Sequence, residues 1–204
     1  MKVRTEARRE AIIEAAAVLF QEVGYERASM NELTKRLGGS KATLYGYFPS
    51  KEALFVEVVR SVATVHLSEA VAQLSAPDRN EVTLEQMLMR FGERMLFVLT
   101  NESSALAVYR MVMAEAGRSN IGMLFYEAGP SECNEVLSTW MAEAMTRGEL
   151  RQADPQAKAA QFLALLTAEV QVRLYRPSSE PLDVEQIQEL AGRAVEMFLL
   201  GARE

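Results

Sequence analysis

The sequence predicts an all-α protein of about nine helices, and three observations support this prediction. Apolar residues recur along the 204-residue chain at the three- and four-residue spacing of amphipathic helices. No segment of strand length alternates apolar and polar residues with β-branched enrichment. Serine, aspartate, glycine and proline separate the apolar segments, and these residue types commonly begin and end helices.

The first two predicted helices have clear boundaries. Apolar residues recur at helical spacing over residues 12–23, and Gly24 stands at the position of a C-terminal cap. Ser29, followed three residues later by Glu32, is a capping-box pattern. We therefore expect a short second helix over residues 30–37.

A glycine pair, Gly38–Gly39, separates the second predicted helix from the third. Ser40 can cap a third helix over residues 41–47, and Pro49 ends it because the residue before a proline is disfavoured in helical conformation. Three short helices with a glycine turn between the second and third are typical of a helix-turn-helix domain, whose later helix enters the major groove of DNA. We expect such a domain over residues 1–50.

Longer predicted helices follow and form a second domain over residues 51–204. Ser50 and Asp183 stand at N-cap positions, and Pro155 lies in a first turn, where proline is tolerated. The expected helical ranges are 51–74, 83–100, 103–117, 121–147 with an interruption at Gly129–Pro130, 155–175 and 184–199.

Charge is distributed unevenly along the chain, whose formal net charge is -6. Residues 1–51 hold nine basic and six acidic side chains, a net charge of +3, so the remainder carries -9. A basic N-terminal segment on an acidic body suits a protein that presents one end to a polyanion. The difference is modest, and a chance distribution remains an alternative.

Composition disfavours several other classes of protein. The sequence has no apolar run of 18 residues and no apolar signal core after its charged N-terminus, so neither a membrane span nor a secretory signal is expected. Cys133 is the only cysteine, which excludes an intramolecular disulfide and favours the cytoplasm. His66 is the only histidine and lacks neighbours at ligand spacing, so no metal site is expected.

An enzyme is a disfavoured alternative. The sequence contains no glycine-rich phosphate loop, no nucleophile elbow and no histidine cluster. We therefore predict no catalytic residues and no cofactor. A second alternative is an interaction protein, a helical dimer whose DNA-binding head has lost its function.

The third predicted helix has a face suited to DNA. Leu44 and Phe48 take its inward side, together with leucines of the second helix. The remaining residues combine small side chains with hydrogen-bond donors, which a groove-entering helix needs. The outward residues are Lys41, Ala42, Thr43, Tyr45 and Tyr47. Taken singly, the lysines could be solvated surface residues and the tyrosines core residues.

Residues 40–55, SKATLYGYFPSKEALF, closely resemble the DNA-binding region of the TetR family of bacterial repressors, and the likeness begins at Gly24. The resemblance covers about the first quarter of the chain. It implies that Lys41, Ala42 and Tyr45 face base edges. It also implies phosphate contacts by four residues: Ser29, Thr43, Tyr47 and Lys51.

Three positions depart from the family pattern or from good helix chemistry. Leu37 stands where alanine is usual in the family, and Gly39 stands where a small branched apolar residue is usual. We expect the glycine pair to loosen the turn and Leu37 to fill the space. Gly46 lies inside the recognition helix, at a cost of about 1 kcal/mol relative to alanine.

The larger domain is expected to hold a small effector of unknown identity among its helices, since ligand pockets often form between bundle helices. Methionines are frequent after residue 80 and suit a plastic apolar pocket, although ordinary helix core is the favoured interpretation of any single one. The candidate wall residues are Val62, Met87, Phe91, Met95, Tyr109, Met113, Phe125 and Trp140.

The last two long helices carry apolar stripes that are wider than one neighbouring helix requires, which predicts a four-helix homodimer interface. The candidate interface residues are Phe162, Leu166, Val170, Leu190, Ala194 and Phe198. The whole pattern predicts a cytoplasmic, ligand-responsive transcription regulator. We expect a repressor that binds a palindromic operator as a dimer, and that an apolar or amphipathic effector releases.

Overall fold

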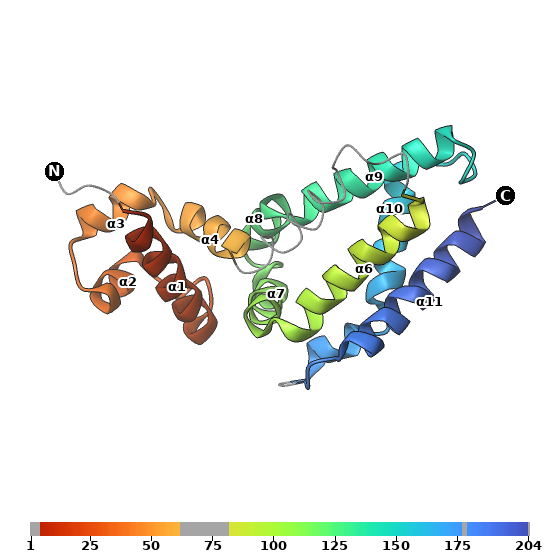
Figure 1. Ribbon diagram of the computed structural model, residues 1–204. Helices are drawn as coiled ribbons and strands as arrows, with labels where there is room; N and C mark the ends of the chain where they lie inside the picture. Colours follow the sequence, from red (N-terminus) through yellow and green to blue (C-terminus); the bar gives the residue numbers. More distant parts are fainter. Residues whose placement is uncertain (1–4, 62–81, 177–178, 204) are drawn as a thin grey trace. The chain divides into compact units, whose positions relative to one another are not determined.

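In the computed structural model, residues 5–61, 82–176 and 179–203 are described, and every regular element within these ranges is a helix (Figure 1). The prediction of an all-α protein is confirmed. The α-helices are α1 (Glu6–Val23), α2 (Met30–Leu37), α3 (Lys41–Tyr47), α4 (Lys51–Val59), α6 (Leu84–Asn101), α7 (Ser103–Glu115), α8 (Ile121–Ala128), α9 (Pro130–Thr146), α10 (Pro155–Ala168) and α11 (Val184–Ala202). A short 3-10 helix, η3 (Gln171–Tyr175), follows α10.

Polar caps set the helix starts that the sequence indicated. Ser29, Ser40 and Ser50 each accept, through the side-chain oxygen, a backbone N–H from the first turn of the helix that follows. At α2 this bond comes from Glu32, which is one half of the predicted capping box. Asp183 forms a reciprocal capping box at the start of α11.

One predicted range differs from the structure, and another extends beyond the described residues. The helix expected over residues 155–175 ends at Ala168, and the chain continues as η3. The expected continuation of the fourth helix to residue 74, which includes Val62 and His66, lies outside the described residues. The predicted interruption at Gly129–Pro130 is present, since α8 ends at Ala128 and α9 begins at Pro130.

The chain forms two compact units, each with its own hydrophobic core. Unit 1 comprises α1 to α4, the part of α7 from residue 107 onward, and α8. Its core is centred on Phe20, Tyr25 and Phe55, whose ring centroids lie 5.1 to 5.7 Å apart. Helix α4 packs against α1 and α8 and therefore belongs with the N-terminal helices.

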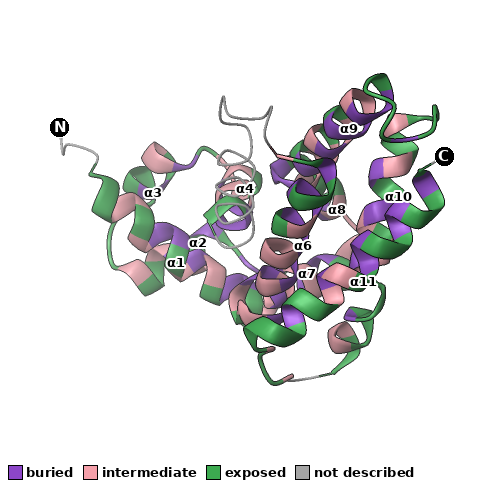
Figure 2. Ribbon diagram, turned by 45° about the vertical axis from the view of Figure 1, so that its right-hand side comes forward, coloured by how far each residue is buried: buried purple, intermediate pink, exposed green. Residues whose placement is uncertain are grey.

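Unit 2 contains α6, α9, α10 and α11. Its largest buried side chains include Phe91, Trp140 and Phe162. Helix α6 lies against α10 and α11, and Gly92 permits this close approach, because a Cβ there would be 3.0 Å from a methyl group of Leu166. Figure 2 shows buried and exposed residues alternating along α11, as expected for an amphipathic helix.

Among the described residues, none of the helices is both long enough and apolar enough to cross a bilayer. The same residues contain no group of three or more histidine, cysteine or acidic side chains that could hold a metal ion.

Candidate nucleic-acid interface

Helix α3 is fixed in unit 1 by its inward side. Leu44 and Phe48 are each only 3% exposed and pack into the core, which turns the opposite side of the helix to solvent. The outward residues at its start are Lys41, Ala42 and Thr43, and all three are exposed. This is the orientation that base and phosphate contacts require.

The first turn of α3 is well ordered by its cap. The Ser40 side-chain oxygen accepts the Thr43 N–H at 3.1 Å, and the two hydroxyl oxygens lie 2.9 Å apart. Tyr45 follows with 48% of its surface exposed. Ser29, at the start of α2, is also exposed, and its hydroxyl oxygen accepts the Glu32 N–H at 3.1 Å. The Ser29 hydroxyl can still donate a hydrogen bond to a phosphate oxygen, whereas one of the Ser40 and Thr43 hydroxyls donates to the other.

Tyr47, expected on DNA phosphate, has a partner inside the chain. Its hydroxyl oxygen accepts the backbone N–H of Thr5 at 3.0 Å, and the side chain is half-buried. Thr5 is the N-cap of α1, so this bond ties the end of α3 to the start of α1. The hydroxyl proton of Tyr47 can still be donated.

Lys51, also expected on phosphate, lies against the loop between α1 and α2. Its ammonium donates to the carbonyl oxygens of Tyr25 at 3.0 Å and Ala28 at 3.3 Å, with a longer contact to that of Glu26. The same group lies 4.2 Å from the centre of the Tyr25 ring, a cation–π arrangement. These contacts use the donors of Lys51 within unit 1.

Arg8 supports the turn between α2 and α3, a role that its basic charge alone does not indicate. Its guanidinium donates to the carbonyl oxygens of Leu37 at 3.3 Å and Gly38 at 3.1 Å. Gly38 has a φ of 60°, a conformation that favours glycine. The turn expected to be loose is thus held from α1, and a basic residue near the start of the first helix was its only signal in the sequence.

The candidate effector residues fall in different parts of the structure. Met87, Phe91 and Trp140 are buried in the core of unit 2, with Met95 packed beside them. The rings of Phe91 and Trp140 meet edge to face with centroids 6.2 Å apart. The indole N–H of Trp140 is buried and has no hydrogen-bond acceptor among the described residues.

The other candidate effector residues do not share that core. Tyr109 and Phe125 belong to unit 1, where their ring centroids lie 5.9 Å apart. Met113 is 53% exposed on the surface of α7. Val62 lies outside the described residues.

Most of the predicted dimer residues are buried within the single chain. Leu190 is half-buried, and the other five are nearly inaccessible: Phe162, Leu166, Val170, Ala194 and Phe198, each 7% exposed or less. Their apolar stripes pack with α6 in the core of unit 2. Within the single chain this packing covers most of their surface, although the Phe198 ring also lines a groove on the outward side of α10 and α11.

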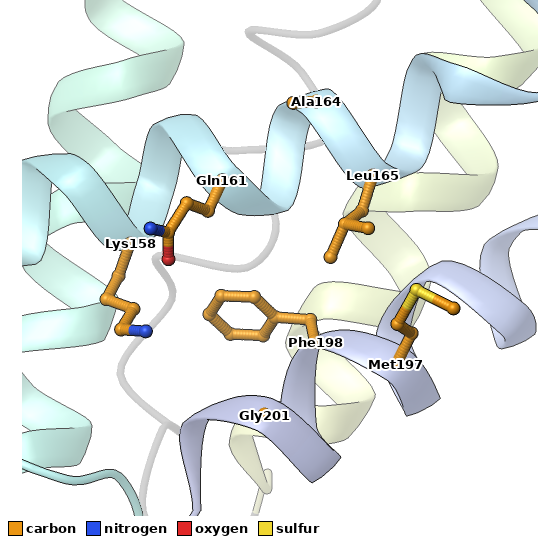
Figure 3. Close-up of a pocket in the computed structure, with 7 residues that line it drawn as sticks. All are labelled: Lys158, Gln161, Ala164, Leu165, Met197, Phe198 and Gly201. Atoms are coloured by element: carbon orange, nitrogen blue, oxygen red, sulfur yellow. The ribbon is translucent and has the colours of Figure 1, made fainter.

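The outward side of α10 and α11 presents a different set of residues around a shallow groove. In Figure 3 the Phe198 ring lies in the middle of the groove, with Lys158 and Gln161 at one end and Leu165 and Met197 at the other. Met197 is 63% exposed, and the neighbouring Leu200 is 77% exposed. This outer side therefore combines exposed apolar residues with one polar end at Lys158 and Gln161.

Comparison with known protein families gives two matches. Residues 12–58 match the model for bacterial regulatory proteins of the tetR family. Residues 86–201 match the model for the C-terminal domain of AefR-like transcriptional repressors.

Among curated relatives, the A-factor receptor protein of Streptomyces griseus is 31% identical over 102 residues, and RutR of Escherichia coli strain K12 is 36% identical over 62 residues. These matches span 50% and 30% of this chain, but only 33% and 29% of the relatives. The nucleoid occlusion factor SlmA of Marinobacter nauticus is 27% identical, with 83% of each chain covered.

Solved structures match over nearly the whole chain. The flavonoid-responsive regulator FrrA has a TM-score of 0.76 and 30% identity, with 98% of both chains covered. A TetR-family transcriptional regulator from Mesorhizobium loti has the same TM-score with 26% identity, and both chains are covered completely.

Proposed function

Because the chain belongs to the TetR family of bacterial transcription regulators, we propose that it is a repressor whose homodimer binds a palindromic operator. In this proposal a small apolar or amphipathic effector releases the protein from DNA. A regulator of chromosomal genes in a bacterium acts in the cytoplasm. The helix-turn-helix domain and the C-terminal regulator domain together support this function.

The observation that carries the proposal is the exposed face of α3 beside the exposed start of α2. Lys41, Ala42 and Tyr45 are proposed to face base edges. A lysine there can donate to guanine, and a small side chain lets the helix backbone come close to the bases. Ser29 and Thr43 are proposed to donate to phosphate oxygens on either side of the groove. All five are exposed, and α3 cannot rotate because Leu44 holds it in the core.

Two further residues take revised roles in this proposal. Tyr47 and Lys51 each have partners within unit 1, so their main contribution is to hold α1, α2 and α3 in position. The hydroxyl proton of Tyr47 can add a phosphate contact beside that positioning bond. Removing either side chain should therefore disturb the shape of the interface.

The effector is proposed to bind in unit 2, near Phe91 and Trp140. A buried N–H without an acceptor costs about 1–3 kcal/mol, and an effector oxygen beside Trp140 would recover that energy. The aromatic and apolar surroundings of this N–H suit an apolar or amphipathic effector that carries a carbonyl or hydroxyl oxygen. The name of the related regulator FrrA, described as flavonoid-responsive, is consistent with this class of compound.

The dimer is proposed to form through the outer side of α10 and α11. Met197 and Leu200 are exposed on α11, and exposed alanines on α10 permit close helix packing: Ala157, Ala160 and Ala164. A two-fold axis between two copies would place this surface against itself. The helices are those expected from the sequence, but the face is the opposite one.

A pool of genomic fragments, incubated with the full-length protein at two salt concentrations, tests the proposal. A repressor should enrich the same short palindrome at both concentrations, because base contacts persist when phosphate attraction weakens. Uniform, salt-sensitive binding without an enriched sequence would overturn it. That result would favour an interaction protein whose DNA-binding head is vestigial.

A further inference from the structure

Glu115, the last residue of α7, binds the loop that joins α1 to α2. One carboxylate oxygen accepts the backbone N–H of Tyr25 at 3.0 Å, and the other accepts that of Glu26 at 3.1 Å. Charge-assisted bonds of this kind are stronger than bonds between neutral groups, and their two-point geometry fixes direction as well as distance. The contact joins residues 90 positions apart in the chain.

The chain around this contact is shaped to receive the carboxylate. Gly24 has a φ of 78°, which turns the next two N–H groups toward Glu115. A Cβ at Gly24 would lie 2.5 Å from the carboxylate oxygen that binds Tyr25, so only glycine leaves room for it. The backbone at Gly24 and the carboxylate of Glu115 therefore fit one another.

Lys51 binds the carbonyl oxygens of the same loop, whereas Glu115 binds its N–H groups. Its ammonium donates to the carbonyl oxygens of Tyr25 and Ala28, while Glu115 accepts the N–H groups of Tyr25 and Glu26. The peptide groups of the loop are thus bound on both sides by charges of opposite sign. Rotating any of these peptide groups would break a charge-assisted bond.

The position of this loop decides where α2 begins. Ser29, the N-cap of α2, follows Ala28 directly, and α2 packs in turn against α3. A shift of the loop therefore moves both the phosphate-facing start of α2 and the helix proposed to read the bases. A misplacement of about 1 Å is enough to lose well-oriented contacts.

We propose that Glu115 is a positioning residue for DNA binding, which holds the loop of residues 24–28 so that α2 and α3 meet DNA in the correct orientation. The inference rests on the proposed DNA-binding function. It assigns to α7 a direct part in shaping the interface, although Glu115 itself carries the same sign of charge as DNA.

The sign of that charge makes the test decisive. Removing an acidic side chain near DNA should by charge alone strengthen binding, because phosphate repulsion is relieved. We expect Glu115→Gln to do the opposite and weaken binding of the enriched operator about tenfold, as the loss of one charge-assisted bond implies. Glu127→Gln is the matched control, since Glu127 is exposed on α8 in the same unit and the charge change is identical.

Glu115→Asp is a second variant, which keeps the negative charge but shortens the side chain by one methylene group. It should also weaken binding, whereas Glu127→Gln should leave affinity unchanged or slightly increased. Operator titrations are made with each full-length protein below its unfolding transition. Equal affinities for Glu115→Gln and Glu127→Gln would overturn the proposal.

Amide hydrogen exchange measures the contact without DNA. In Glu115→Gln the N–H groups of Tyr25 and Glu26 should exchange faster, while that of Leu33 in α2 keeps its protection. Unchanged exchange at Tyr25 and Glu26 would contradict the proposed role, as would a uniform loss of protection across unit 1. If the wild-type protein selects no DNA sequence, the repressor proposal fails, and the exchange result still reports on Glu115.

Discussion

Lys51 lies at the start of α4 with its ammonium enclosed by carbonyl oxygens and the Tyr25 ring. A lysine bound in this way stabilises the fold, and its loss leaves acceptors without donors. A lysine bound to phosphate instead releases a counterion, which appears as a salt dependence of DNA binding. The two roles thus have different experimental signatures.

We predict that Lys51→Ala lowers the free energy of unfolding by about 1–3 kcal/mol and leaves the salt slope of DNA binding unchanged. Urea unfolding and operator titration over a range of salt concentrations measure the two effects. Lys35→Ala is the control, because Lys35 is exposed on α2. A salt slope reduced by about 1, with unchanged stability, would restore the phosphate role implied by the family resemblance.

Cys133 is a second residue whose surroundings decide its chemistry. Burial, aided by the neighbouring Glu132, raises the pKa of its thiol to about 11. The unfolded thiol ionises near its ordinary pKa of about 8.5, so the unfolded state loses its proton first as the pH rises. Folding stability contributed by this group is therefore complete below about pH 8.5 and declines above it.

We predict that the wild-type protein loses about 1–2 kcal/mol more stability than Cys133→Ala between pH 8 and pH 10. Urea unfolding at both pH values makes the comparison. The native thiol should also react with thiol reagents far more slowly than the unfolded chain at pH 8. Rapid native labelling, or equal pH dependence of the two proteins, would contradict this account.

The α2–α3 turn is the element on which the orientation of the recognition helix depends most directly. Arg8 donates to the carbonyl oxygens of Leu37 and Gly38, so α1 fixes the turn, whose backbone the two glycines would otherwise leave flexible. The turn can be repositioned without any change to the side chains that face DNA.

We predict that Arg8→Ala weakens operator binding roughly tenfold and leaves binding to unrelated DNA nearly unchanged. The ratio of the two affinities, measured by titration at one salt concentration, reports the orientation of α3. If both affinities fell together and the salt slope decreased, Arg8 would be a phosphate contact and not a support for the turn.

Helix ends and the helix-turn-helix could be predicted from the sequence because their signals are local. Ser29, Ser40 and Ser50 cap helices where a serine precedes a helical pattern, and Gly24 follows α1. The exposed side of α3 followed in turn from the inward positions of Leu44 and Phe48.

The long-range contacts could not be predicted in this way. An apolar stripe gives the width of a buried face but not the partner that covers it: the Phe162 ring, expected at a dimer interface, meets the rings of Phe91 on α6 and Phe198 on α11 within the chain. The bonds of Arg8 and Glu115 join residues that are 29 to 90 positions apart, and no spacing rule relates such pairs.

At the scale of the whole molecule, the outer side of α10 and α11 is the surface proposed for the dimer. Met197 and Leu200 are largely exposed there, whereas Phe198 between them is only 4% exposed. Met197 and Leu200 can therefore be changed to test the proposed dimer, whereas a change at Phe198 would disturb the core of unit 2.

We predict that the double variant Met197→Glu/Leu200→Glu is monomeric at micromolar concentration and unfolds at nearly the wild-type temperature. Phe198→Glu should instead destabilise the fold, since it buries a charge without a partner. Sedimentation velocity and thermal unfolding distinguish the two outcomes. A dimer that persists in the double variant would show that assembly uses another surface.

The central claim is that α3 of a dimer reads operator DNA, and selection from a randomised double-stranded DNA pool tests it most directly. The wild-type protein should enrich a two-fold symmetric sequence whose half-sites lie about 34–36 Å apart, or a multiple of that distance. Lys41→Ala should enrich a sequence with relaxed preference at one position in each half-site, at a cost of about 1–3 kcal/mol for the wild-type operator. No enriched sequence for the wild-type protein, or the same preference in both proteins, would contradict the account.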